Sequence, residues 1–170
     1  SDGYLNIGTG WVTLTPYNNN LINTVSNSGN LNTFAVNASA PFIRPSINLK
    51  DNVKIVSGNG TEEDPYRLLG DNDEQLSGTF LNTRYSGEYI NFGTGENNLY
   101  RIVSHETRGL TKITSFEPLK ENGSFIQSAF GDTVNYSSNN IIGNFLNNDY
   151  LNPNNNYLTT EQINMIEDNT

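Results

Sequence analysis

The sequence predicts an α+β fold in which short antiparallel strands form meanders and two helices lie in the C-terminal third of the chain. Three observations support this prediction. Segments in which apolar and polar residues alternate recur as far as Phe116, and Asn, Gly and Pro residues separate them. Beyond Gly131 the apolar residues take helical spacing. Because the strands precede the helices rather than alternating with them, separate β and α parts are favoured over a parallel sheet.

The first third of the chain is expected to form β-strands. Alternating segments lie at 11–15, 21–25, 31–36 and 53–56. Gly29, in the turn before the third segment, supplies the left-handed conformation that a short hairpin loop favours. Pro41 and Pro45 flank Arg44 in a further apolar segment, 42–49, and each lacks a backbone donor. This strand is therefore expected at the edge of a sheet, or interrupted.

A second group of strands is expected in the middle of the chain. Its segments lie at 89–92, 99–103 and 110–116, and the turn between the first two contains Gly93 and Gly95. Together these segments predict a meander.

The two helices are expected after these strands. Apolar residues at 141, 142, 145 and 146 place a stripe on one helical face, and Ser137 or Ser138 is the expected N-cap. A second helix is expected to begin at Thr159 or at the next residue. Thr159 and Gln162 have the spacing of a capping box, in which each residue satisfies a backbone donor of the other.

The composition excludes several classes of partner. The chain has 170 residues, a net charge of −9 and only nine Lys and Arg residues, which are scattered. Nucleic acids and anionic membrane surfaces require clustered cations, so neither is expected as a partner. There is no Cys and therefore no disulfide. No apolar run is long enough to insert into a membrane, and an export signal is expected outside this segment.

Motifs in both halves of the chain carry a resemblance to a known group of domains. In the second half they are Tyr89-Ile-Asn-Phe92, Leu99-Tyr-Arg-Ile-Val103, Thr111-Lys-Ile-Thr114, Leu146-Asn-Asn-Asp-Tyr-Leu151 and Leu158-Thr-Thr-Glu-Gln162. In the first half they lie at 3–17, 44–50, 53–61 and 65–68. With these motifs the chain resembles an uncharacterised family of extracellular repeat domains from surface-exposed or pilin-like proteins of Gram-positive bacteria and from some of their phages. The closing half of such a unit is also similar to C-type-lectin-like folds.

The resemblance implies a division of the chain, because the motifs that close a unit come first. Residues 1–70 would be the closing, C-terminal half of one β-rich repeat unit. Residues 71–78, which are polar and acidic, would be a linker. Residues 79–170 would be the opening, N-terminal half of the next unit, with a β-meander and two helices.

The function implied by the resemblance is that of a non-catalytic structural or adhesive module, outside the cell, in a bacterial surface protein or pilus-like filament. Its partners would be neighbouring copies or adjacent repeats, or a surface glycan or host protein. The alternative is a lectin-like module that binds carbohydrate or protein. A hydrolase ranks third, because the single histidine, His105, is next to Glu106 in sequence but has no identifiable orienting partner.

Two groups of residues are candidates for ligand binding. Trp11, Tyr17 and Arg44 could form an aromatic and cationic patch for a ligand, although a single Trp in an alternating strand is also a typical core residue. Asp71, Asp73 and Glu74 offer the oxygen ligands that Ca²⁺ prefers, but they lack the remaining positions of a calcium-binding loop. No cofactor is expected, and Ca²⁺ is the alternative.

A further group predicts a stiff joint between modules. Gly58, Gly60 and Thr61 form a turn cluster that leads to Pro65 and Tyr66. Thr61 would cap the turn, Pro65 would fix the backbone, and Tyr66 would pack against the preceding module.

Overall fold

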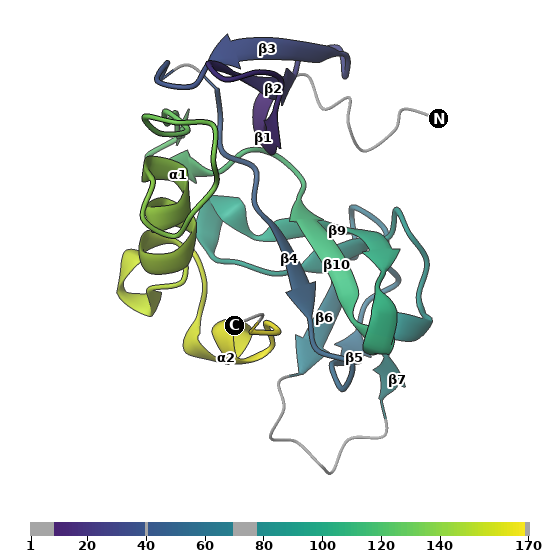
Figure 1. Cartoon of the computed structure of the whole chain (residues 1–170). Coiled ribbons are helices and arrows are strands. Elements are labelled where there is room, and N and C mark those ends of the chain that lie inside the picture. Colours follow the sequence, from purple (N-terminus) through teal and green to yellow (C-terminus); the bar gives the residue numbers. More distant parts are fainter. Residues whose placement is uncertain (1–8, 40, 70–77, 169–170) are drawn as a thin grey trace. The chain divides into compact units, whose positions relative to one another are not determined.

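The computed structural model describes residues 9–39, 41–69 and 78–168 (Figure 1). The chain forms two compact units. Unit 1 consists of Ser1–Pro45 and Glu117–Asn155, and unit 2 consists of Ser46–Phe116 and Asn156–Thr170. Within the described residues, no helix has the length and apolar character needed to span a bilayer.

Unit 1 contains a three-stranded antiparallel sheet with the strand order β1-β2-β3. Its strands are β1 (Trp11–Pro16), β2 (Leu21–Val25) and β3 (Leu31–Ala35). These strands agree closely with the alternating segments of the sequence. Gly29 adopts a φ of 81° in the turn between β2 and β3, as the hairpin prediction requires.

The rest of unit 1 comes from the later part of the chain. Its elements are β11 (Lys120–Glu121), β12 (Ser124–Phe125), α1 (Ile141–Asn144), a π-helical turn (Phe145–Asp149) and a 3₁₀ turn (Pro153–Asn155). Backbone hydrogen bonds tie this part to the first: Phe130 N–H donates to the Val36 carbonyl, and Leu119 N–H donates to that of Ile43. The buried apolar side chains include Ile22, Ile43, Leu119, Phe130, Ile142 and Tyr150.

Unit 2 contains a seven-stranded sheet with the order β4-β10-β9-β8-β6-β5-β7. The strands are β4 (Ser46–Leu49), β5 (Lys54–Ser57), β6 (Tyr66–Leu69), β7 (Thr79–Phe80), β8 (Tyr89–Asn91), β9 (Leu99–His105) and β10 (Thr111–Ser115). β6 and β8 are parallel, and all other neighbours in the sheet are antiparallel. Helix α2 (Thr160–Asn164) and 3₁₀ turns at Leu81–Thr83, Gly95–Asn97 and Thr107–Gly109 complete the unit.

The expected division at residues 71–78 does not match the compact units. Strands from both sides of this segment share the sheet of unit 2, since β5 pairs with β7 and β6 pairs with β8. Unit 1 likewise combines residues from both ends of the expected division. The physical reason is that β4 and β6 find their partners far along the same chain, and local patterns do not encode such pairing. Residues 71–77 of the expected linker lie outside the described residues.

Over the residues that the structure describes, the fold is β-rich, with only two short α-helices. The predicted capping box is confirmed: Gln162 N–H donates to Thr159 Oγ1 at 3.1 Å, and Thr159 N–H donates to Gln162 Oε1 at 3.0 Å. The expected start of α1 was wrong. Asn140 is the N-cap and accepts a hydrogen bond from Gly143 N–H, while the Ser137 carbonyl is used in a turn with Asn140 N–H.

The expectation for segment 42–49 is confirmed. Phe42 makes only isolated bridges, and the regular strand β4 begins after Pro45. β4 lies at one end of the seven-stranded sheet and pairs there with β10. The segment is therefore interrupted at its prolines, and β4 is the terminal strand of the sheet, where its far side makes an isolated bridge from Leu49 to Ile166.

Candidate interaction surfaces

Strand β3 is half-paired. It pairs with β2 and with no other strand in the part of the chain that the structure describes. Two hydrogen bonds show which residues of β3 face β2 with their backbone groups. Val36 N–H donates to the Asn20 carbonyl, and Ser26 N–H donates to the Asn30 carbonyl, so the even-numbered residues are the hydrogen-bonded ones. Residues 32 and 34 therefore direct their backbone groups toward β2, and residues 31, 33 and 35 direct theirs away from it.

Few of these outward backbone groups have another partner. Thr33 N–H donates to the adjacent Asn32 Oδ1 at 2.9 Å, and the Ala35 carbonyl accepts from Ala38 N–H at 3.0 Å. Within the described ranges, the N–H and the carbonyl of Leu31 have no hydrogen-bond partner. An edge of this kind is a template for pairing with another strand.

Apolar side chains of β3 are also left exposed to solvent. Trp11, Val25 and Leu31 form one cross-strand row, in which the first two are buried and Leu31 is 77% exposed. Three pairs along the ladder, on the opposite face of the sheet, Ile22 is fully buried and its partner Phe34 is 37% exposed. Apolar side chains that are buried on β2 thus lie opposite exposed apolar side chains on β3, where a further strand would cover part of their surface.

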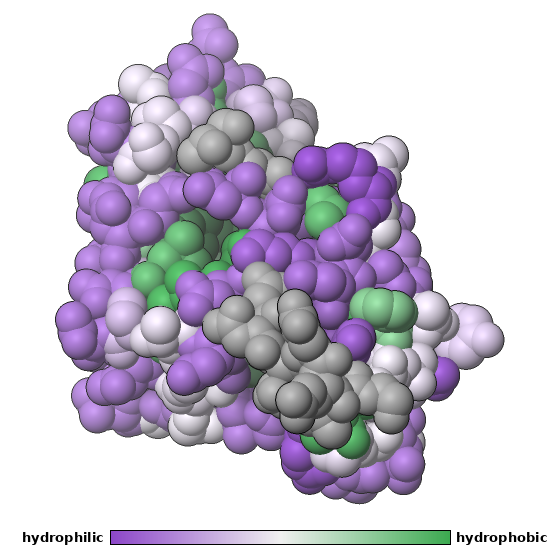
Figure 2. All heavy atoms as spheres, turned by 90° about the horizontal axis from the view of Figure 1, so that it is seen from below, coloured by the Kyte–Doolittle hydropathy of each residue, from purple (hydrophilic) through white to green (hydrophobic). Residues whose placement is uncertain are grey.

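The three strands β1, β2 and β3 carry no charged side chain. The sequence contains no Asp, Glu, Lys or Arg between Asp2 and Arg44, although the chain carries a net charge of −9. On the face of the molecule that Figure 2 shows from below, hydrophilic residues also dominate, and apolar side chains form separate areas between them. Natural edge strands commonly carry charged side chains or Pro that discourage pairing. β3 has neither.

The structure brings together two of the three predicted ligand-binding residues. The Arg44 guanidinium lies 4.5 Å from the centre of the Trp11 ring, and both residues are buried. Tyr17 follows the far end of β1 and is 64% exposed. Because the three residues do not form one open patch, the Trp11 and Arg44 pair is placed to stabilise the core of unit 1.

The predicted joint is a turn inside unit 2. Asn59 and Gly60 donate their N–H groups to the Asp64 carbonyl, and Asp64 N–H donates to Thr61 Oγ1. Gly60 has a φ of 77°, and a Cβ there would lie 2.5 Å from the Tyr66 ring.

This turn corrects the expectation of an inter-module joint at Gly58, Gly60, Thr61, Pro65 and Tyr66. The residues lie in or beside the loop that connects β5 and β6, which are paired neighbours, and not at a boundary between the two units. Tyr66 is buried in the core of unit 2 itself. Turn chemistry was predicted, but its place in the sheet depends on long-range pairing.

The calcium prediction cannot be placed, because Asp71, Asp73 and Glu74 lie outside the described residues. Among the residues that the structure does describe, no group of three or more His, Asp or Glu side chains is arranged to hold a metal ion.

Tyr66, Arg84 and Glu88 form a polar cluster in unit 2. Glu88 accepts hydrogen bonds from Tyr85 N–H at 2.8 Å, from Arg84 Nη2 at 3.0 Å and from the Tyr66 hydroxyl at 3.2 Å. Burial opposes ionisation of Glu88, but the bonds from Tyr85 and Arg84 outweigh it and lower the pKa of this carboxyl. The cluster uses its polar groups internally and therefore fits a structural role.

His105 is the last residue of β9, and its two ring nitrogens contact a hydroxyl and a backbone carbonyl. Its Nδ1 is 3.2 Å from Thr111 Oγ1, and its Nε2 contacts the Arg84 carbonyl. Glu106 accepts from Ser104 Oγ at 2.7 Å and pairs with Lys112 Nζ at 2.9 Å, and these contacts, in that order, lower the pKa of its carboxyl. The neighbouring His and Glu are thus engaged with different groups.

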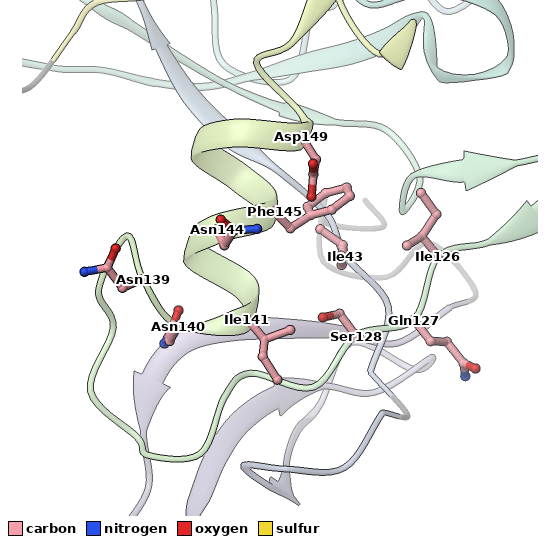
Figure 3. A pocket seen from close by; sticks show the side chains of 10 residues that line it. All are labelled: Ile43, Ile126, Gln127, Ser128, Asn139, Asn140, Ile141, Asn144, Phe145 and Asp149. Carbon is pink, nitrogen blue, oxygen red and sulfur yellow. The ribbon is translucent and has the colours of Figure 1, made fainter. Parts of the chain in front are cut away.

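A pocket of about 430 Å³ lies in unit 1 between α1, the π-helical turn and residues 126–128 (Figure 3). Its lining combines apolar side chains with amides and one carboxylate: Ile43, Ile126, Gln127, Ser128, Asn139, Asn140, Ile141, Asn144, Phe145 and Asp149. Figure 3 shows the Asp149 carboxylate beside the Phe145 ring, whereas Asn139 and Gln127 point outward. No pattern in the sequence indicated this pocket.

The π-helical turn shapes this pocket. Tyr150 N–H donates to the Phe145 carbonyl five residues earlier, at 2.8 Å. Residues five apart lie on different faces of an α-helix, but a π turn stacks them. Asn144 and Asp149 can therefore line the same pocket, and π-helical turns are frequent at functional sites.

No protein-family model, no curated protein and no solved structure matches the chain. Its candidate surfaces are therefore defined by geometry alone.

The cluster of Tyr66, Arg84 and Glu88 should make the stability of the fold depend on pH. The lowered pKa of Glu88 means that its contribution to stability is present above the pKa of the unfolded chain and is lost as the pH falls through the folded-state pKa. Glu88→Gln should reduce the free energy of unfolding by about 1–3 kcal/mol at neutral pH. The difference from the wild type should shrink in acid, as measured by urea denaturation followed by circular dichroism across a pH series. Glu121→Gln, at an exposed position, is the control. Equal losses at every pH would contradict an ionised Glu88 in this cluster.

Proposed function

We propose that this chain is a non-catalytic structural or adhesive module of a bacterial cell-surface protein or pilus-like filament, and that it works outside the cell through contact. The observation that carries the proposal is the half-paired, uncharged strand β3, whose outward backbone groups and apolar side chains suit pairing with a neighbouring strand. The resemblance to extracellular repeat domains and the absence of Cys are consistent with it. Within this proposal the fold is classed as α+β.

Neighbouring copies or adjacent repeats are the partners that this function requires. A surface glycan or host protein would be contacted in the adhesive form of the proposal. The described side chains support contact better than catalysis, because His105 and the Tyr66, Arg84 and Glu88 cluster use their polar groups within the fold.

The alternative function is that of a lectin-like module that binds carbohydrate or protein, and the pocket in unit 1 favours its carbohydrate form. Amide groups and a carboxylate can exchange hydrogen bonds with sugar hydroxyls, while Phe145 and the Ile side chains can cover an apolar sugar face. Asp149 is the one charged group of the lining, so a neutral polyhydroxy ligand fits it better than an anionic one.

The proposed function predicts surface exposure and retention. An antibody against the chain should label intact cells of the organism that encodes it. Leu31→Lys should reduce the amount retained on washed cells by about tenfold or more, because a charge on the β3 edge opposes pairing. Tyr85→Lys, at a similarly exposed aromatic position in unit 2, should retain the wild-type amount. Labelling only after permeabilisation, or equal retention of both variants, would contradict the proposal.

The alternative function predicts ligand-induced changes at the pocket. In NMR titrations with glucose, galactose and N-acetylglucosamine, the amide signals of residues 126–128 and 141–149 should shift with at least one sugar. Asp149→Asn should weaken the response by several fold, since it removes a charged acceptor. Exposed Asp132→Asn is the matched control. Shifts that are absent, or that spread evenly over the chain, would exclude this site for these sugars.

A further inference from the structure

The outward residues of β3 restrict how a second strand can pair with it. Residues 31, 33 and 35 direct their backbone groups away from β2, so hydrogen-bonded pairs across the free edge must use these odd-numbered positions. For two antiparallel copies of β3, a two-fold axis at Thr33 is the register that pairs all three of them. Thr33 then faces Thr33 of the second copy, and Leu31 faces Ala35.

The side chains suit this register. Leu31, the most exposed large apolar residue of the sheet, would be covered by Ala35 of the second copy, and Phe34 would lie opposite Asn32. Both faces of the edge strand are uncharged, so no like charges meet at the contact. Asn32 Oδ1 would release Thr33 N–H to the new partner, and the Ala35 carbonyl has a second lone pair beside the one that Ala38 uses.

We propose that two copies of this chain associate by antiparallel pairing of their β3 strands about a two-fold axis at Thr33, which joins the two three-stranded sheets of unit 1 into one continuous sheet. This inference rests on the proposed contact function and names its partner as a second copy. Two-fold contacts are self-complementary. β3 meets that condition, because residues 31 and 35, on either side of Thr33, both direct a backbone N–H and a carbonyl outward.

The charge of the chain sets the salt dependence of this association. Each copy carries a net charge of −9, while the contact strand carries none. Repulsion between the copies is therefore long-range and is screened by salt. Added salt should strengthen the association, whereas it would weaken a contact held by ion pairs.

Cysteine cross-linking tests the register directly, because the chain contains no Cys. In Thr33→Cys the two introduced residues would face each other with Cα atoms about 5.5 Å apart, within the range of a disulfide. In Asn32→Cys they would be diagonal neighbours, about 7–8 Å apart, which is beyond it. Under mild oxidation the purified Thr33→Cys chain should form a covalent dimer at least about tenfold faster than Asn32→Cys and than an exposed control, Tyr85→Cys. Circular dichroism should show the wild-type fold for all three.

Several results would overturn the inference. Cross-linking of Asn32→Cys in preference to Thr33→Cys would show another register. Equal rates for all three variants would show random collision. A wild-type chain that stays monomeric by light scattering at every salt concentration would exclude self-pairing. If such a chain still labels intact cells and still loses retention through Leu31→Lys, only the identity of the partner is overturned and the proposed function stands.

Discussion

The constraint on which this account depends is the need of every backbone donor and acceptor for a partner. In β2 that need is met on both sides, by β1 and β3. Among the described residues, β3 has a partner strand on one side only, and its exposed Leu31 and Phe34 lie opposite buried Val25 and Ile22 of β2. Solvent satisfies the free polar groups of an isolated chain, but it does not cover the apolar side chains. The same edge therefore offers hydrogen bonds and apolar area to an incoming strand.

In unit 2 the need of β6 for backbone hydrogen bonds is met within the chain itself. β6 is paired on one side by its hairpin neighbour β5 and on the other by the parallel strand β8, which comes from beyond residue 78. The turn that carries Gly60 is fixed in place by Tyr66 packing and by Tyr89 N–H, which donates to the Gly60 carbonyl. Residues expected to form a joint between modules thus stabilise the inside of one sheet.

Local patterns predicted much of the secondary structure, and long-range pairing explains most of what they missed. The hairpin around Gly29 and the capping box of Thr159 and Gln162 depend on residues close in sequence, so both could be recognised. The parallel pairing of β6 with β8 is not visible in either segment alone, and a division near residue 70 followed from missing it. The short strands β7, β11 and β12 span two residues each, which is too short for a periodic signal. The pocket with Asn144 and Asp149 was missed because helical spacing assumes an α-helix, and this segment contains a π turn.

The measurement that tests the central claim most directly is amide hydrogen exchange along β3 as a function of protein concentration. Asn32 and Phe34 direct their N–H groups toward β2, whereas Leu31 and Ala35 direct theirs toward the free edge. Exchange at Leu31, Thr33 and Ala35 should slow as the concentration rises, while exchange at Asn32 and Phe34 should stay constant. Exchange at the three outward positions that remains fast at every concentration would contradict the central claim.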